Sequence, residues 1–240
     1  ALIVAIHLVL AVGVLLNRVR DLAVPDSPGT AGGGETARAS VVVVARDEET
    51  RLPRLLDSLA AQSLRDFEIV LVSDRSQDRT LAIMQAFRRR HGERVKVLEN
   101  RDTVRHLGPK QYVLDLAVAA SSGALLLFTD ADCVLPRGWV AGLLSYFRNP
   151  KVGVVFGQLS LPDRGGFLQR FQAFDQPLVH QWNAGSAGLG MAGSCFGNNL
   201  AARRRFLQEL GGFAALGYTL TEDAALVTAA AGNGWRVLVS

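Results

Sequence analysis

Asp130 and Asp132 are separated by one residue and follow the apolar run Leu125–Phe128. A short apolar run with Gly123 before it and Pro136 soon after it is typical of a fully buried parallel strand. In open α/β sheets, ligands bind beyond the carboxyl ends of such strands. Two carboxylates at that position can converge on one hard cation such as Mg²⁺ or Mn²⁺. The sequence therefore predicts a metal site at the end of this strand.

Two more acidic segments follow apolar runs, namely 45–49 (ARDEE) and 73–78 (SDRSQD). Because the carboxyl ends of parallel strands meet at one edge of a sheet, we expect these segments and residues 129–132 (TDAD) to line a single carboxylate-rich pocket. Asp and Glu also favour the first turn of a helix, where they cap backbone N–H groups and complement the helix dipole. For Glu49 and Asp78 we favour this capping role.

The elements that would position these segments alternate between strand and helix patterns. This alternation predicts βαβ units with right-handed crossovers and a mostly parallel sheet flanked by helices. A chain of 240 residues with 49% hydrophobic content can bury the core that such an α/β domain needs. The expected strands are Ser40–Ala45, Phe67–Ser73, Val95–Leu98, the run from Leu125, and Val152–Phe156, and the expected helices are Leu52–Gln62, Thr80–Arg90, Gln111–Ala120 and one after Pro136.

The second half of the chain is less regular. Aromatic residues recur at helix-like spacing between Phe167 and Trp182, a pattern more typical of a core or an interface than of a cofactor site. Residues 185–199 are dense in glycine, which indicates either a close approach of the backbone to a ligand or a loop that moves. The GSAGLG within this segment matches a dinucleotide-binding fingerprint only loosely, because no strand opens a βαβ unit before it.

The N-terminal segment is apolar from Ala1 to Leu16, apart from one histidine. We expect residues 1–20 to form a transmembrane helix that is shortened at its N-terminus, with a buried core helix as the alternative. Arg18 and Arg20 follow the apolar stretch. The positive-inside rule therefore places the following domain in the cytoplasm, at the inner face of the cell membrane.

Residues 21–38 are rich in Pro and Gly and are expected to form a flexible linker. The folded domain is expected to occupy residues 39–240. The chain lacks an initiating Met and stops just after a strand-like segment, WRVLVS, so we expect it to be part of a longer protein.

Composition argues against several classes of protein. The net charge of +4 and the pI near 9.5 suit a protein that works beside anionic lipid or holds phosphorylated ligands. No patch of interleaved basic and aromatic residues is present, which argues against nucleic-acid binding. Cys133 and Cys195 lie far apart without a CxxC or a nearby pair of histidines. Neither a zinc site nor a disulfide framework is therefore expected.

Taken together, the acidic segments resemble those of family 2 glycosyltransferases with the GT-A fold, and the resemblance extends from Ser40 to about Ser240. VARDEE resembles the PARNEE-like segment that follows the first strand of that family, with Val44 in place of the proline. SDRSQD resembles its DDxSxD segment, with Ser73 in place of the first aspartate. Both segments stand at the ends of expected strands.

Three further motifs follow in the order of that family. GPKQYVL resembles its GKxxAL-like element, with an inserted Pro109. Asp130 and Asp132 match its DxD motif, and residues 221–223 match its TED motif. Short acidic motifs are common one by one, but five of them in order, each at an expected strand end or helix start, make the resemblance specific.

The resemblance implies a role for each matching residue. Asp223, with Glu222 beside it, would be the catalytic base that takes the proton of the acceptor hydroxyl, with inversion at the anomeric carbon. Asp132, helped by Asp130, would hold Mg²⁺ or Mn²⁺ against the diphosphate leaving group. The residues that would bind the nucleotide sugar are Ala45, Glu48, Asp74, Lys110 and Asp130.

The implied function is metal-assisted transfer of a sugar from a nucleotide sugar to a hydroxyl of a lipid-linked or envelope glycan acceptor, beside a membrane that the aromatic stripe would face. Two alternatives stay open: an inactive membrane-tethered module that binds nucleotide sugars, and a phosphohydrolase that uses the DxD carboxylates. In phosphohydrolases of the haloacid dehalogenase type, that motif follows the first strand, whereas here it follows the fourth. A solvated surface position is the alternative for Lys110, and helix capping is the alternative for residues 221–223.

Overall fold

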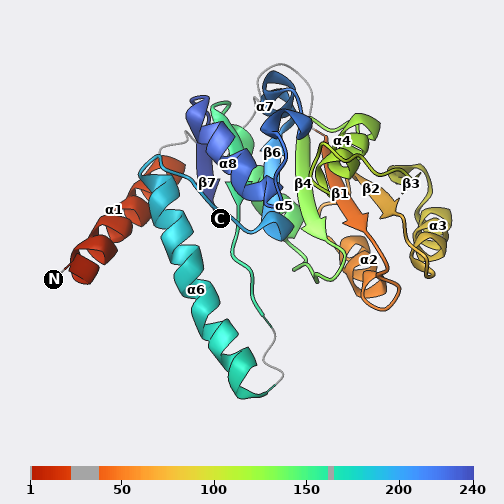
Figure 1. The fold of residues 1–240 in the computed structure, drawn as a ribbon, viewed down its shortest axis with the longest axis horizontal. Coiled ribbons are helices and arrows are strands. Elements are labelled where there is room, and N and C mark those ends of the chain that lie inside the picture. Colours follow the sequence, from red (N-terminus) through yellow and green to blue (C-terminus); the bar gives the residue numbers. More distant parts are fainter. Residues whose placement is uncertain (1, 23–37, 162–164) are drawn as a thin grey trace.

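The computed structural model describes residues 2–22, 38–161 and 165–240 of the chain (Figure 1). In this part of the chain, seven strands form one sheet in the order β3-β2-β1-β4-β6-β5-β7. Neighbouring strands are parallel except where β6 pairs with β4 and β5, which are antiparallel contacts. The strands are β1 (Ala39–Ala45), β2 (Phe67–Asp74), β3 (Val95–Asn100), β4 (Leu125–Asp130), β5 (Val152–Phe156), β6 (Leu200–Arg203) and β7 (Arg236–Val239).

Every strand expected from the sequence is present, and the valine run of β1 shows why. Val41 and Val43 pack in the core on one face of the sheet, and Val42 packs in the core on the other. Successive side chains of a strand point to opposite faces, so an unbroken apolar run is buried on both sides. The strand β6 was not expected, because its four residues, LAAR, are too few to show a period.

Helices cover both faces of the sheet (Figure 1). Side chains of α2, α3 and α5 fill one core, and side chains of α4, α7 and α8 fill the other. The expected mostly parallel sheet flanked by helices is thus confirmed. The helices are α1 (Leu2–Leu22), α2 (Leu52–Ala60), α3 (Thr80–His91), α4 (Gln111–Ala120), α5 (Trp139–Ser145), α6 (Phe167–Gly188), α7 (Arg204–Leu210) and α8 (Glu222–Gly232), and the short 3₁₀ turns are η1 (Gly92–Arg94), η2 (Tyr146–Arg148), η3 (Gly197–Asn199) and η4 (Ala214–Leu216).

Glu68, near the start of β2, holds together the end of the sheet where the parallel strands begin. Its carboxylate accepts hydrogen bonds from Ser40 Oγ at 2.5 Å and from Ser122 Oγ at 3.0 Å. Gly123 N also donates to it, at 3.1 Å, and Lys96 Nζ lies 3.0 Å away. Burial by itself raises the pKa of a carboxyl, but these partners hold the pKa of Glu68 down to about 2. This buried carboxylate is structural.

The helices α1 and α6 pack against each other, and α6 extends away from the sheet (Figure 1). A Cβ added to Gly13 would lie 2.0 Å from the carbonyl oxygen of Gly185, and one added to Gly188 would lie 1.7 Å from that of Gly13. Such small residues let two helix backbones approach closely. The glycine-dense segment 185–199 was expected to approach a ligand or to move. Its first residues instead lie in α6, where Gly185 and Gly188 let α1 pack closely against this helix.

The expectation of a transmembrane helix at residues 1–20 is not supported. Within the described residues, we find no helix that combines the length and the apolar character needed to cross a bilayer. The helix α1 continues to Leu22, past the expected start of the linker at residue 21, and residues 23–37 lie outside the described part of the chain.

The aromatic stripe of α6 is exposed rather than buried in the core. Phe167 is 87% exposed and Phe174 is 68% exposed. Large apolar side chains are also exposed on α1, so the two packed helices together present an apolar surface to solvent. We call this the α1–α6 surface; its large exposed apolar side chains are Leu8, Val9, Val12, Leu15, Leu16, Phe167, Leu168, Phe171, Phe174, Leu178, Val179 and Trp182.

Candidate active site

A cavity of about 350 Å³ lies at the carboxyl ends of β1, β2 and β4, and we call it the strand-end cavity. Every residue that the sequence assigned to nucleotide-sugar or metal binding lines it. The sheet brings them together because β1 lies between β2 and β4 and all three strands run parallel. The lining residues are Val44, Ala45, Arg46, Glu48, Asp74, Arg75, Pro109, Lys110, Asp130, Ala131 and Asp132.

Asp74, at the end of β2, is buried and held in a fixed orientation. Arg75 Nε donates to its Oδ1 at 2.8 Å, and Arg75 Nη2 donates to its Oδ2 at 2.7 Å. Asn100 Nδ2, at the end of β3, donates to the same Oδ1 at 2.7 Å. These hydrogen bonds leave part of the acceptor capacity of the carboxylate for a ligand. Arg75 was not singled out from the sequence, although it stands between the matched residues of SDRSQD.

The loops after β1 and β2 are hydrogen-bonded to each other. Asp47 Oδ1 accepts from Gln77 N at 2.7 Å, and Asp78 Oδ2 accepts from Glu49 N at 2.9 Å. Asp47 and Arg75 both have φ near +54°, an unusual conformation for residues other than glycine. Such backbone strain is found most often at functional sites, where the surrounding structure maintains it.

Glu49 and Asp78 bind backbone N–H groups at the start of α3. Asp78 Oδ1 accepts from Thr80 N at 2.9 Å, and Glu49 Oε2 accepts from Arg79 N at 3.1 Å. Burial by itself raises the pKa of the Asp78 carboxyl, but the hydrogen bonds from Thr80 and Glu49 hold it below its usual value. Neither residue lies in the first turn of a helix, but both carboxylates bind N–H groups at the start of α3, and for Glu49 this is not α2, the helix that follows it in the chain.

Lys110 connects the strand-end cavity with the TED segment. Its Nζ lies 2.7 Å from Asp130 Oδ1 and 3.7 Å from Glu222 Oε1. Burial lowers the pKa of an ammonium group, but the carboxylates of Asp130, Glu222 and Asp223 outweigh it and raise the pKa of Lys110. Lys110 therefore remains charged beside these groups. It does not occupy the solvated surface position that was the alternative for it.

The loop before Lys110 packs against the chain that leads into the TED segment. A Cβ added to Gly108 would lie 1.9 Å from the carbonyl oxygen of Thr219, so only glycine fits there. The buried side chain of Gln111 fastens the two segments, since its Oε1 accepts from Gly108 N at 2.6 Å and its Nε2 donates to Gly217 O at 2.8 Å. These contacts bring α8 close to the strand-end cavity.

Asp223, in the first turn of α8, faces the 3₁₀ turn η3. Its Oδ2 accepts a hydrogen bond from Gly197 N at 2.9 Å, and a Cβ on Gly197 would lie only 2.8 Å from that oxygen. Thr221, the N-cap residue of α8, makes no side-chain hydrogen bond to the helix. The capping alternative is thus weakened for Thr221, but Asp223 Oδ1 accepts from Ala224 N of the first turn at 2.8 Å, so Asp223 both binds the start of α8 and is oriented by a segment 26 residues earlier in the chain.

Cys195 lies near the same acidic pair. Burial raises the pKa of its thiol strongly, and the nearby carboxylates of Asp223 and Glu222 add to the shift. Cys133 is also a free cysteine, and burial raises the pKa of its thiol as well. Neither thiol is activated as a nucleophile.

Asp132 is the exposed carboxylate of the strand-end cavity. Its carboxylate makes a weak contact with Cys133 Sγ at 3.9 Å, whereas Asp130 Oδ1 accepts a hydrogen bond from Lys110. Among the described residues, no three His, Cys, Asp or Glu side chains converge to enclose a metal ion. Mg²⁺ is commonly held by one or two protein carboxylates together with substrate phosphates. The donor set fits an ion of that kind.

Solved structures of glycosyltransferases share this fold. The chain aligns with the mannosyltransferase PcManGT from Pyrobaculum calidifontis, solved in complex with GDP-Man and Mn²⁺, with a TM-score of 0.68 and 22% identity over 98% of this chain and 66% of that chain. It also aligns with residues 1–349 of S. aureus TarS in complex with UDP-GlcNAc, with a TM-score of 0.60 and 20% identity over 85% of this chain and 56% of that one. At these identities the likeness shows the fold, a GT-A-like α/β sheet.

Curated relatives extend the comparison to sequence. The chain is 35% identical over 102 residues to a dolichyl-phosphate beta-glucosyltransferase of Drosophila melanogaster, covering 39% of this chain and 30% of the relative. It is 24% identical over 226 residues to a beta-monoglucosyldiacylglycerol synthase of Synechocystis sp., covering 93% of this chain and 46% of the relative. The chain spans less than half the length of these relatives.

The family model for glycosyl transferase family 2 matches residues 40–210, which hold β1 to β6 and the whole lining of the strand-end cavity. Because the match covers most of the chain, and the fold and the motif order agree with it, the chain belongs to glycosyl transferase family 2.

Proposed function

We propose that this chain is the transferase domain of an inverting glycosyltransferase. It would move a sugar from a nucleoside diphosphate sugar to a hydroxyl of a lipid-linked or envelope glycan acceptor, with Mg²⁺ or Mn²⁺ as cofactor. The main support for the proposal is the position of Lys110. Its ammonium group pairs with Asp130 in the strand-end cavity and lies beside the Glu222 carboxylate of the TED segment. A group that binds the donor and a group that can take a proton are thereby brought together.

The strand-end cavity supplies the contacts that a nucleotide needs. Asp74 and Glu48, with the backbone of Ala45, would hold the nucleoside, and Lys110 would place a positive charge beside the diphosphate. Burial raises the pKa of the Glu48 carboxyl, and the nearby Arg51 partly offsets this shift. The similar structures solved with GDP-Man and with UDP-GlcNAc support a nucleotide-sugar donor.

The reaction needs a base beside the acceptor hydroxyl. It also needs a positive charge beside the diphosphate, which is the leaving group of the donor. The acceptor oxygen would form a bond to the anomeric carbon, its proton would pass to Asp223, and the bond from that carbon to the diphosphate would break with its electron pair. Attack from the face opposite the leaving group inverts the configuration. Asp132, with Asp130, would hold the divalent cation, which when bound neutralises charge on the diphosphate.

The proposal is tested by a donor screen followed by product analysis. We expect one class among UDP-, GDP- and dTDP-sugars to raise the melting temperature, and to raise it more in the presence of Mn²⁺ than in its absence. The transferred sugar should have the opposite anomeric configuration in an NMR spectrum of the product, and retention would disprove inversion. Binding without transfer would favour the inactive module, and release of inorganic phosphate would favour the phosphohydrolase.

We also propose that the domain works at the inner face of the cell membrane, in the cytoplasm, with the α1–α6 surface against lipid. A helix that exposes aromatic and aliphatic side chains can lie in the headgroup region of a bilayer. The relatives named for glucosylation of dolichyl phosphate and of diacylglycerol support a lipid-linked acceptor.

Replacing both Phe171 and Phe174 with Ser should weaken binding to liposomes that contain anionic lipid, because two exposed aromatic side chains of α6 would no longer enter the bilayer. Sedimentation with the liposomes measures the bound fraction. Tyr218→Ser is the matched control, because Tyr218 is also exposed but lies outside the α1–α6 surface. Equal binding of the double variant and the unchanged protein would refute the membrane contact.

A further inference from the structure

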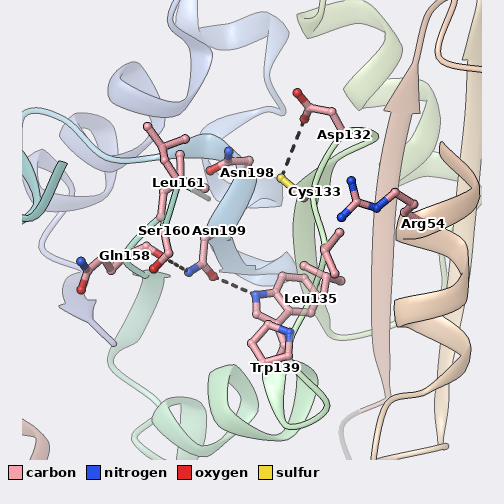
Figure 2. Close-up of a pocket in the computed structure, with 13 residues that line it drawn as sticks. Arg54, Asp132, Cys133, Leu135, Trp139, Gln158, Ser160, Leu161, Asn198 and Asn199 are labelled. Carbon is pink, nitrogen blue, oxygen red and sulfur yellow. Dashed lines mark hydrogen bonds between the residues drawn. The ribbon is translucent and has the colours of Figure 1, made fainter. Parts of the chain in front are cut away.

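A second and larger cavity, of about 680 Å³, lies on the other side of Asp132 from the strand-end cavity. We call it the Trp139 cavity (Figure 2). Its volume is in the range of roughly 300–1,000 Å³ that is common for small-molecule sites. Asp132 lines both cavities, so a donor bound in the first would have its diphosphate at the boundary between them. The Trp139 cavity is therefore placed for the partner that receives the sugar.

The wall of the Trp139 cavity is largely apolar. Val134, one of the lining residues, is 56% exposed, so apolar surface of this wall meets solvent. Binding of a hydrocarbon there would remove apolar surface of the protein and of the ligand from water. The apolar lining residues are Val134, Leu135, Pro136, Trp139, Leu159 and Leu161.

Asn199 keeps this wall in place. Its Oδ1 accepts from Trp139 Nε1 at 2.9 Å, and its Nδ2 donates to the carbonyl oxygen of Gln158 at 2.9 Å (Figure 2). The Trp139 ring and the chain that follows β5 are thereby joined through η3. The cavity is a built feature of the fold, since the two sides of it are connected by hydrogen bonds.

Two polar groups in the Trp139 cavity have no partner among the described residues. The guanidinium of Arg54 points from α2 into the cavity, and we find no ion pair or hydrogen bond for it in that part of the chain (Figure 2). Asn198 Oδ1 is buried without a hydrogen-bond partner. A buried acceptor of this kind is costly unless a donor reaches it. Arg51, one turn before Arg54, is by contrast paired with Glu48 at 3.5 Å.

The Arg54 guanidinium indicates which chemical group a ligand of this cavity would carry. A guanidinium binds an oxyanion through two parallel N–H donors, whether the oxyanion is a phosphate or a carboxylate. Asn198 also lines the cavity, although its unpaired oxygen is enclosed by protein atoms. Asn198 directly follows Gly197, whose N–H orients the proposed base Asp223. The cavity lining therefore continues directly into the segment that orients the proposed base.

The Trp139 cavity also adjoins a cavity that is lined in part by α6. A neighbouring cavity of about 430 Å³ shares Arg54, Asp132 and Leu161 with it and is otherwise lined in part by Gln169 and Gln172 of α6. The exposed side chains of the α1–α6 surface begin at the same end of this helix. The N-terminal part of α6 therefore lies beside Arg54 and Asp132.

We propose that the Trp139 cavity binds the acceptor, and that the acceptor is an amphiphile whose hydrocarbon lies against the apolar wall and whose oxyanion binds Arg54. This inference rests on the proposed glycosyl transfer and narrows its acceptor to an anionic lipid. Arg54 is exposed to solvent, so a neutral sugar chain would make no charged contact with its guanidinium, and it would place polar groups against the apolar wall. Arg54 acts in acceptor recognition and touches neither the nucleotide nor the transferred proton.

The test measures binding of short amphiphiles below their micelle concentration, by isothermal titration calorimetry. Octyl phosphate and octanoate supply the two oxyanions, and octyl glucoside supplies the same chain without charge. The unchanged protein should bind the better oxyanion roughly 10- to 100-fold more tightly than octyl glucoside, as one charge-assisted contact allows. Arg54→Gln should abolish that preference, and the tighter of the two anions identifies the oxyanion.

Two controls separate acceptor binding from other roles. Arg79→Gln changes an arginine that is 82% exposed on another surface, and it should keep the preference. Nucleotide binding with Mn²⁺ should be unchanged in Arg54→Gln. A preference for the anion that survives in Arg54→Gln overturns the proposal, and so does an equal loss of nucleotide affinity, which would assign Arg54 to the donor. Because no step of this test requires transfer, its failure is distinguishable from failure of the proposed activity.

Discussion

Asp223→Asn is expected to lower the rate of sugar transfer by roughly 10²- to 10⁴-fold, the usual contribution of a general base. An amide cannot take the proton of the acceptor hydroxyl. Its single oxygen can replace Asp223 Oδ2, which accepts from Gly197 N at 2.9 Å, or Oδ1, which accepts from Ala224 N at 2.8 Å, but not both, so one of these two hydrogen bonds is lost while the shape of the side chain is kept. Steady-state kinetics with a saturating donor would show the loss in kcat.

Nucleotide affinity should remain nearly unchanged in the same variant. Asp223 does not line the strand-end cavity, and its link to that cavity runs through the charge of Lys110. Titration of the nucleoside diphosphate with Mn²⁺ into both proteins measures this. Asp66→Asn is the matched control, because its side chain is 72% exposed at the start of β2. Near-normal turnover of Asp223→Asn would remove Asp223 from the role of base.

Asp132→Ala should instead abolish the part of donor binding that depends on Mn²⁺. Asp132 is exposed and makes only a weak contact with Cys133, so the substitution removes a ligand for the cation with little effect on the fold. Exposed sites of this kind usually change the free energy of unfolding by less than about 0.5 kcal/mol. We expect the affinity for the nucleotide sugar in Mn²⁺ to fall at least about tenfold, which corresponds to about 1.4 kcal/mol.

Calorimetry with and without Mn²⁺ distinguishes this result from a general loss of binding. Affinity measured in chelator should be the same for Asp132→Ala and the unchanged protein, because the contacts of Asp74 and Lys110 are retained. Asp66→Ala should behave as the unchanged protein under both conditions. A variant that keeps its full response to Mn²⁺ would show that the cation is held elsewhere.

Most of the sheet could be predicted from the sequence because its signals are local. The valine run of β1 and the leucine run of β4 are buried on both faces, which leaves a continuous apolar pattern. The strand β6 was not predicted, because it is short and pairs antiparallel with β4 and β5. Its place in the sheet depends on those partners rather than on its own four residues.

The glycines and the aromatic residues near α6 show where local patterns fail. Glycine at 185 and 188 indicated a close approach, but only the packed helices show that the partner is α1 rather than a ligand. The stripe from Phe167 to Trp182 indicated a helix face without saying whether protein, lipid or solvent meets it. For the same reason, the apolar N-terminal segment could be recognised as a helix but not assigned to a bilayer.

The sequence alone determined which strands end in carboxylates, and therefore that Asp74, Asp130 and Asp132 would share one edge of the sheet. That follows from strand periodicity and from the common direction of parallel strands. Only the tertiary structure decided that Lys110 pairs with Asp130, that Gly197 orients Asp223, and that Arg54 faces an apolar cavity. These contacts join loops far apart in the chain, and their geometry depends on how the helices pack on the sheet.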